Sequence, residues 1–300
     1  MKTKRFAGID IGSNSVRLLI TDIINYNGSP IFKKEHYFRI PLKLGEDTFS
    51  TGSINDEKKK NLAILMECFK GIMTVCGVEQ WRACATSAIR EASNVSEVID
   101  YIYNQTGMQI DVIDAKEEAH FIVLNNQALQ YEQDQAYLFV DVGGGSVDLV
   151  LYYREKEVAS DSFRLGTIRP SSLERENPEW ERLKLWIETY SSSFPRFHLI
   201  GSGGNINKVD SVLRRCGKIK REELVSFHRK LKDMTIEERA IKYNLNLNRA
   251  DVIIPAIQIY LRIMKMAKAL IIETPIIGVS DGIIKDLYLK NIAQKAEINI

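Results

Sequence analysis

Two short segments of this 300-residue chain share one pattern, and they constrain its fold more than any other feature. Asp10-Ile-Gly-Ser-Asn-Ser15 ends an apolar run that starts at Phe6, and Asp141-Val-Gly-Gly-Gly-Ser146 ends one that starts at Ala136. Each run has the length and composition of a β-strand, and each loop leads into a further apolar run. Internal repetition on this scale indicates that the chain contains the same α/β unit twice.

The first unit is predicted to open with three consecutive strands and then to alternate helices and strands. Apolar runs at Val16–Ile23 and Ile31–Leu44 follow the first loop, and the dipeptide Asn27-Gly28 marks a turn between them. A helical pattern begins after Asn55, whose side chain is typical of a helix N-cap. The expected order is three strands, helix, strand, helix and strand.

A helix from Ala115 to about Gln130 is predicted to lead into the second unit. A long helix at about Arg249–Leu270, a strand at Pro275–Val279 and a helix from Gly282 are predicted to end the chain. We expect this last helix to pack on the first unit. The predicted domains are therefore residues 1–130, joined by 282–300, and residues 131–281.

Charge and cysteine usage exclude several classes of protein. The 41 basic residues nearly balance the 39 acidic ones, and the net charge of +2 favours neither a nucleic-acid partner nor a membrane surface. The four cysteines form no Cys-x-x-Cys pair, which argues against a zinc site and indicates thiols in a reducing cytoplasm. No run of 18 uncharged apolar residues is present, so no membrane span is predicted.

The two loops are candidate phosphate-binding sites. Glycine lets backbone N–H groups approach a phosphate that a Cβ would keep away, and serine and asparagine add further donors. The alternative is a pair of ordinary β-turns with capping aspartates. The candidate phosphate-binding residues in the loops are Gly12, Ser13, Asn14, Ser15, Gly143, Gly144, Gly145 and Ser146.

A strand-end aspartate precedes each loop, and this predicts a metal ion. The carboxylates of Asp10 and Asp141 would repel bound phosphates unless a hard cation lay between them. The expected cofactor is Mg²⁺ or Mn²⁺.

Glu118 is the candidate general base. Asp114 and Glu117 have the spacing of a capping box, which explains Glu117 without chemistry. Adjacent helical residues point about 100° apart, so we expect only Glu118 to face the substrate, where it would orient or deprotonate a water molecule. The alternative is a solvated first-turn glutamate that interacts with the helix dipole.

Two further segments follow predicted strands. Arg90 could bind a phosphate through two parallel hydrogen bonds, or it could be a surface arginine paired with Glu91 or Glu97. The Gly201-Ser-Gly-Gly204 turn, with Gly203 and Gly204, suits a nucleotide's phosphates or ring, although a simple tight turn explains it nearly as well.

Taken together, these motifs resemble the exopolyphosphatase and guanosine pentaphosphate phosphohydrolase (Ppx/GppA) family, and the chain's length resembles its short two-domain members. The resemblance implies a duplicated ribonuclease-H-like fold, as in actin, Hsp70 and sugar kinases, with an inter-domain cleft. It also implies that Glu118 is the catalytic base, and that Asp141 and Asp148 hold the metal. The matching segments are Ala7–Ile20, Ala85–Asn94, Glu117–Ala119, Asp141–Ser146, Gly201–Gly204 and Arg249–Asp251.

The chain departs from the family pattern at several positions. Ser146-Val147-Asp148 replaces the usual Ser-Thr-Glu, which removes a hydroxyl and shortens the acidic side chain by one methylene. His120 stands where an arginine is common, and Asp114-Ala115 replaces the usual Ser-Gly.

The leading hypothesis is a cytoplasmic enzyme that hydrolyses terminal phosphoanhydride bonds of polyphosphate or guanosine pentaphosphate. A kinase that uses Gly201–Gly204 for adenine nucleotide is the second. The third is a non-catalytic protein that binds polyphosphate or a guanosine alarmone, and the sequence at Val147 and Asp148 motivates it. A homodimer is the default expectation for a soluble oligomer.

Overall fold

The chain divides into two compact units. The structure, a computed structural model, describes residues 3–126, 132, 134–194 and 196–298. Unit 1 comprises Met1–Asn125 and Val279–Ile300, and unit 2 comprises Asn126–Gly278. The domain boundary predicted between residues 130 and 131 lies outside the described residues, as does the predicted helix end near Gln130. The second boundary precedes Val279, three residues before the prediction, because the last helix begins there.

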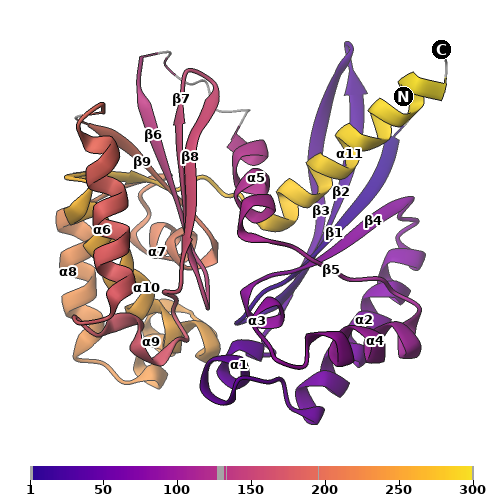
Figure 1. The fold of residues 1–300 in the computed structure, drawn as a ribbon, viewed down its shortest axis with the longest axis horizontal. Coiled ribbons are helices and arrows are strands. Elements are labelled where there is room, and N and C mark those ends of the chain that lie inside the picture. Colours follow the sequence, from indigo (N-terminus) through magenta and orange to yellow (C-terminus); the bar gives the residue numbers. More distant parts are fainter. Residues whose placement is uncertain (1–2, 127–131, 133, 195, 299–300) are drawn as a thin grey trace. The chain divides into compact units, whose positions relative to one another are not determined.

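Unit 1 is built on a mixed sheet (Figure 1). Its strand order is β3-β2-β1-β4-β5, with β1, β2 and β3 antiparallel and β1, β4 and β5 parallel. The strands are β1 (Thr3–Ile11), β2 (Val16–Tyr26), β3 (Ser29–Ile40), β4 (Gln80–Ala85) and β5 (Asp111–Val112). The helices are α1 (Leu44–Thr51), α2 (Asp56–Val75), α3 (Ser87–Arg90), α4 (Val95–Thr106), α5 (Ala115–Asn126) and α11 (Val279–Ile298).

Strand β1 is buried on both faces of this sheet, since successive side chains alternate between the faces. Ala7, Ile9 and Ile11 pack in a core with α2 and α4. Phe6 packs on the opposite face with Ile284 of α11. Burying apolar side chains on both sides explains why the first strand reads as an almost unbroken apolar run.

Two glycines let helix α11 approach the rest of unit 1 closely. A Cβ built on Gly8 would lie 2.6 Å from the carbonyl oxygen of Ser280, and one on Gly282 would lie 2.4 Å from that of Phe121. Backbone therefore meets backbone where α11 crosses β1 and α5. The prediction that the last helix packs on the first unit is confirmed.

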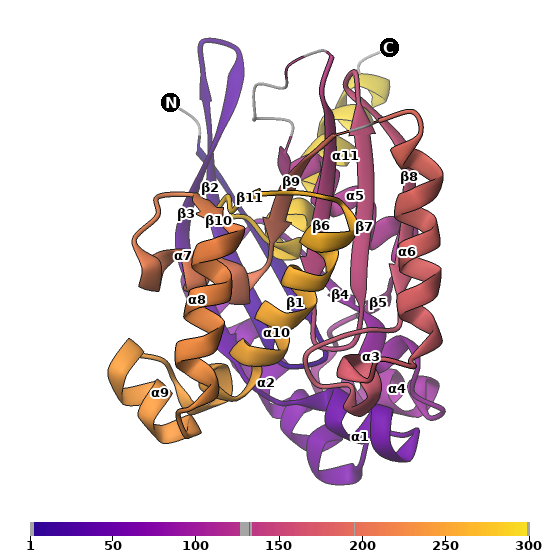
Figure 2. The same cartoon turned by 90° about the vertical axis from the view of Figure 1, so that its left-hand side faces the viewer.

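Unit 2 has a second mixed sheet (Figure 2). Its order is β10-β11-β9-β6-β7-β8, in which β6 is antiparallel to β7 and parallel to β9. The strands are β6 (Ala136–Val142), β7 (Val147–Tyr153), β8 (Lys156–Phe163), β9 (Phe197–Ser202), β10 (Lys218–Lys220) and β11 (Ile271–Glu273). The helices are η1 (Pro170–Leu173), α6 (Pro178–Ser191), α7 (Gly204–Leu213), α8 (Arg221–Lys232), α9 (Ile236–Tyr243) and α10 (Leu247–Met266).

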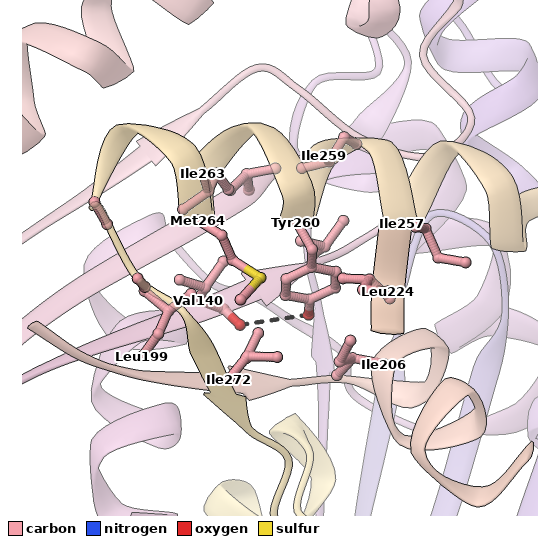
Figure 3. Packing of buried hydrophobic residues seen from close by; sticks show 14 of the residues in the cluster. Val140, Leu199, Ile206, Leu224, Ile257, Ile259, Tyr260, Ile263, Met264 and Ile272 are labelled. Carbon is pink, nitrogen blue, oxygen red and sulfur yellow. Dashed lines mark hydrogen bonds between the residues drawn. The ribbon is translucent and has the colours of Figure 1, made fainter. Parts of the chain in front are cut away.

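The core of unit 2 centres on helix α10 (Figure 3). Tyr260 is fully buried among aliphatic side chains, and its hydroxyl donates to the carbonyl oxygen of Ser202 at 2.6 Å. A second acceptor, the carbonyl oxygen of Val140, lies 3.5 Å away. Burial, together with the nearby Asp141 carboxylate, holds the pKa of Tyr260 well above its ordinary value. The neutral phenol thus ties α10 to the ends of β6 and β9.

The two sheets have the same topology, so the predicted duplication is confirmed. The order β3-β2-β1-β4-β5 in unit 1 corresponds to β8-β7-β6-β9-β11 in unit 2. In both, three antiparallel strands are followed by parallel strands, which is the arrangement of the ribonuclease-H-like fold.

No helix in the described part of the chain is both long and apolar enough to cross a bilayer.

Two predicted strand ranges are wrong. The strand predicted to reach Leu44 ends at Ile40, because Pro41 has no N–H for the ladder, and Leu44 begins α1. The strand predicted at Pro275–Val279 is instead β11. Ile276, which looked like a core residue, is 80% exposed. A short apolar run in the sequence does not show which of its residues pair with a neighbouring strand.

We predict that Gly282→Ala destabilises unit 1 by about 2 kcal/mol, because the new Cβ would overlap the backbone of Phe121. Gly71→Ala is the matched control. Gly71 lies inside α2 with nothing within 4 Å of an added Cβ, so alanine should stabilise the chain by up to about 1 kcal/mol. Thermal unfolding of both variants measures the difference. Equal midpoints would contradict the close packing of α11.

Candidate functional site

The turns that follow β1 and β6 have the same internal hydrogen bond. The N–H of Gly12 donates to the carbonyl oxygen of Ser15 at 3.2 Å, and the N–H of Gly143 donates to that of Ser146 at 3.0 Å. A Cβ on either glycine would lie 3.2 Å from the same serine oxygen. The matched loops of the sequence are therefore matched turns in the structure.

Each turn is also held from outside by the segment that follows the third strand of its sheet. In unit 1 the carbonyl oxygen of Ser13 accepts from the N–H of Gly45 at 2.9 Å. In unit 2 the carbonyl oxygen of Gly144 accepts from the N–H of Ile168 at 3.0 Å. Gly166 makes this possible, since a Cβ there would lie 2.2 Å from the Gly144 oxygen.

These contacts occupy carbonyl oxygens and leave donors available. Among the described residues, the backbone N–H groups of Ser13, Asn14, Gly144 and Gly145 donate to no backbone acceptor. Clustered N–H groups of this kind form concavities that bind anions. The turns therefore have the donors that phosphate oxygens require, and phosphate binding by them stays a prediction.

Polar side chains of the first turn are buried. Within the described residues, the Oδ1 atom of Asn14 and the Oγ atom of Ser15 have no hydrogen-bond partner. Ser13 Oγ lies 2.8 Å from the Oγ of Ser87, the first residue of α3. The turn is thereby linked to the helix that carries Arg90.

The strand-end aspartates face different partners. Asp10 pairs in register with Arg17 across the β1–β2 hairpin, and the buried Asp10 carboxylate forms an ion pair with the partly exposed Arg17 side chain. Asp141 pairs in register with Asp148 across the β6–β7 hairpin. At this pair of equivalent positions, unit 1 has an acidic and a basic residue, whereas unit 2 has two acidic residues.

The acidic pair of unit 2, Asp141 and Asp148, has the chemistry of a cation site. Asp148 is only 3% exposed, and its Oδ2 accepts from the Oγ of Ser146 at 3.0 Å. Gly203, at φ +96°, lies so close that a Cβ there would be 2.6 Å from the Oδ1 of Asp141. Directly opposed carboxylates repel each other, and a hard cation relieves the repulsion. In its described residues, neither unit groups three or more His, Cys, Asp or Glu side chains around one point.

Glu118 is 6% exposed, so it is not the solvated first-turn glutamate of the alternative interpretation. Its Oε2 lies 3.4 Å from Nη1 of Arg90, and that nitrogen also donates to the carbonyl oxygen of Ile113 at 2.8 Å. Arg90 is thus not a surface arginine paired with Glu91 or Glu97. The structure brings together two predicted site residues of unit 1.

The capping-box prediction is half right. Asp114 Oδ1 accepts from the N–H of Glu117 at 2.8 Å, as a helix cap should. The Glu117 carboxylate instead pairs with Arg82 at 2.8 Å. Consecutive glutamates therefore point in different directions, with Glu117 tied to a structural arginine and Glu118 buried beside Arg90.

The Gly203–Gly204 turn opens helix α7, as predicted. Arg249, from α10, donates from Nη1 to the carbonyl oxygen of Gly204, and a Cβ on that glycine would lie 3.0 Å from this nitrogen. The turn is thus held between Asp141 on one side and Arg249 on the other.

Residue-type reasoning assigned no role to three arginines that contact these turns and aspartates. Arg17 neutralises Asp10, Arg169 donates from Nε to the carbonyl oxygen of Gly145, and Arg249 binds Gly204. Arg249 lies in a segment that matches the family pattern, and a tight hairpin between Ile11 and Val16 places Arg17 opposite Asp10.

A buried thiol also lies near the first carboxylate, since Cys84 pairs in register with Asp10. Burial raises the pKa of Cys84 to about 12. The thiol is therefore neutral at physiological pH, which argues against a cysteine nucleophile.

Part of the chain is similar in sequence to known proteins. Residues 33–177 match the model of the Ppx/GppA phosphatase family. Exopolyphosphatase 1 of Mycobacterium tuberculosis strain H37Rv is 28% identical over 165 residues, which cover 55% of this chain and 47% of that protein. Guanosine-5'-triphosphate,3'-diphosphate pyrophosphatase of Aliivibrio fischeri strain MJ11 is 28% identical over 163 residues, which cover 54% and 32%. The chain thus spans less than half the length of these two relatives.

The fold also matches a solved structure. The Aquifex aeolicus member of the Ppx/GppA family superposes with a TM-score of 0.75 at 22% identity, over 97% of this chain and 99% of that one. The duplicated sheets and their paired turns define a two-domain protein of the ribonuclease-H-like fold class. More narrowly, residues 33–177 of the chain are similar to the Ppx/GppA phosphatase family.

We predict that Arg17→Met destabilises unit 1 by roughly 3 kcal/mol, because it leaves the Asp10 carboxylate buried without its cation. Adding Asp10→Asn should recover much of the loss. Arg154→Met, which removes an exposed pair with Asp134, is the matched control and should change stability by less than about 1 kcal/mol. Urea unfolding measures all three. If Arg17→Met lost no more stability than Arg154→Met, the ion pair of Arg17 with Asp10 would not be the structural contact described above.

Proposed function

We propose that this protein is a phosphohydrolase that releases terminal phosphate from inorganic polyphosphate or guanosine pentaphosphate by attack of water. The observation that carries the proposal is the repeated turn, whose backbone donors are matched between Gly12–Ser15 and Gly143–Ser146. The match of residues 33–177 to the Ppx/GppA phosphatase family supports it.

Glu118 acts as the general base. As water attacks the terminal phosphorus, Glu118 accepts its proton, and the bond from that phosphorus to the bridging oxygen breaks. The remaining phosphate chain leaves with the bridging oxygen. Arg90 holds Glu118 from one side and restricts its rotamers, which favours a fixed direction for the attacking water.

Each turn can hold phosphates of the substrate. The N–H groups of a turn bind non-bridging oxygens, and in unit 1 the Asn14 and Ser15 side chains supply further polar atoms. Arg90 is a cation of unit 1, and its side chain is 24% exposed beside Glu118. Donors and cations of this kind stabilise the charge that gathers on phosphoryl oxygens in the transition state.

Mg²⁺ or Mn²⁺ is the proposed cofactor, held by Asp141 and Asp148. The fit rests on two buried carboxylates directly opposed across one hairpin. Asp10 is a weaker candidate for the metal, because Arg17 already neutralises its charge. When bound, the cation would neutralise phosphate oxygens and so favour departure of the leaving phosphate.

We also propose a cytoplasmic location. The cysteines Cys68, Cys76, Cys84 and Cys216 are free thiols, which a reducing compartment would maintain. A homodimer, and the absence of nucleic-acid and membrane partners, stay predictions.

We predict that Glu118→Gln lowers kcat for phosphate release from polyphosphate by at least about a hundredfold, because the amide cannot accept the proton. Glu117→Gln is the matched control. Its side chain pairs with Arg82 in a structural contact, so its kcat should stay within about threefold of native. A malachite-green assay on polyphosphates of several lengths and on guanosine pentaphosphate gives both rates.

The two neighbouring glutamates make the outcome decisive. Native turnover in Glu118→Gln, with circular dichroism unchanged, would remove Glu118 from the mechanism. No phosphate release by the native protein from any of these substrates, with Mg²⁺ and Mn²⁺ supplied, would refute the proposed function itself.

We predict that Mg²⁺ raises the unfolding temperature of the native protein and not that of Asp148→Asn. At a hundred times its Kd, a ligand adds about 2.7 kcal/mol to stability. Without metal, Asp148→Asn should be at least as stable as native, because it relieves repulsion with Asp141. Asp134→Asn, whose side chain is 83% exposed, is the control and should respond to Mg²⁺ like native. An equal response in Asp148→Asn would exclude the acidic pair as the metal site.

A further inference from the structure

Four polar residues form one row across the sheet of unit 2, beside the second turn. In register order the row is Ser162 on β8, Asp148 on β7, Asp141 on β6 and Ser202 on β9. Residues that pair in register point to the same face of a sheet. The acidic pair proposed to hold a cation is therefore flanked by a serine on either side.

Ser202, the serine on the β9 side, has a buried hydroxyl with unused hydrogen-bonding capacity. The residue is 3% exposed, and its Oγ has no hydrogen-bond partner among the described residues. Buried hydroxyls in proteins usually have a partner, because an unsatisfied one gives up its bonds to water without replacement. The Ser202 hydroxyl therefore points to a ligand that bonds it.

The carboxylate of Asp141 lies on the same side as this hydroxyl. Asp141 pairs in register with Ser202, and a Cβ on the next residue, Gly203, would lie 2.6 Å from Asp141 Oδ1. The carboxylate is thus directed toward the end of β9. The apolar core of unit 2 lies on the opposite face, where Val140 and Val142 enter it.

The groups of the row are fixed before any ligand binds. The carbonyl oxygen of Ser202 accepts from the hydroxyl of Tyr260 at 2.6 Å, and Tyr260 is fully buried. On the other side of the acidic pair, Asp148 Oδ2 accepts from the Oγ of Ser146 at 3.0 Å. Groups held in this way lose little conformational entropy when they bind a ligand, so the row is preorganised.

Unit 1 has a different row at the equivalent positions. There Asp10 pairs in register with Arg17 on one side and with Cys84 on the other. A guanidinium and a thiol thus flank a single carboxylate. Hard cations such as Mg²⁺ take oxygen ligands, whereas sulfur ligands favour softer metals. Of these two rows, that of unit 2 alone consists of oxygen-bearing side chains.

We propose that the Ser202 hydroxyl is the third protein oxygen of the cation site at Asp141 and Asp148, where it bonds the cation or one of its water ligands. The inference rests on the proposed function, because it adds a residue to the metal site proposed there. Mg²⁺ keeps several waters when one or two carboxylates hold it, and a group that orders this shell strengthens binding. Ser202 therefore sets part of the affinity of unit 2 for the cation.

Calorimetric titration with Mg²⁺ in the absence of substrate tests the inference. Ser202→Ala removes the hydroxyl and should weaken Mg²⁺ binding about threefold to tenfold. The variant also loses an unsatisfied buried group, so without metal it should unfold at a temperature no lower than native. Thr274→Val is the matched control. It too removes a buried hydroxyl that has no partner among the described residues, but Thr274 follows β11 outside the row, so Mg²⁺ should bind as to native.

Ser202→Cys separates a metal ligand from a structural residue. It places a thiol where unit 1 has one, and it should raise the ratio of Zn²⁺ affinity to Mg²⁺ affinity at least about tenfold over native. A role in folding alone would not change this ratio.

Four results would overturn the inference. They are no Mg²⁺ binding by the native protein, native Mg²⁺ affinity in Ser202→Ala, an equal loss in Thr274→Val, and a native metal ratio in Ser202→Cys. Phosphate release from polyphosphate by the native protein is a separate measurement, so the failure of this inference is distinguishable from that of the proposed function.

Discussion

The chemistry of this protein depends on which residue faces the strand-end aspartate across each hairpin. Both units use the same backbone, a strand, a glycine turn and an antiparallel strand, and in both the aspartate meets a register partner. Arg17 makes the first pair neutral, whereas Asp148 makes the second pair acidic. Two copies of one fold can therefore take different roles, because a single difference in register separates a structural ion pair from the proposed cation site.

Close backbone approaches hold the groups around these hairpins. Gly166 lets the segment after β8 rest on Gly144, and Gly203 lets the start of α7 rest on Asp141. A side chain at either glycine would push apart the elements that fix the second turn. Rigid turns matter for phosphate chemistry, since donors that are already oriented lose little entropy when the anion binds. The glycines thus act through positioning, and Gly166 lies outside every segment that the sequence singled out.

Much of the architecture could be predicted from the sequence, because a repeated sequence pattern indicates a repeated unit of local structure. The strand–turn–strand motif recurs at Asp10 and Asp141, and it led to the correct duplicated fold. The contact between Arg90 and Glu118 could not be predicted, since it joins α3 to α5 across the end of the sheet. Local periodicity predicts elements, and tertiary packing decides which side chains meet.

Two departures from the family pattern are neighbours in the sequence but lie in different surroundings in the structure. Val147, where the family usually has threonine, is fully buried in the core of unit 2 beside Val142 and Leu149. Its side chain contributes to packing, so the missing hydroxyl changes the apolar interior rather than the acidic face of the hairpin. Asp148 lies on that acidic face, opposite Asp141, and its hydrogen bond from Ser146 fixes the shorter carboxylate to the turn. Since side chains alternate along a strand, neighbouring departures have unrelated consequences, and only the one at Asp148 acts on the proposed metal site.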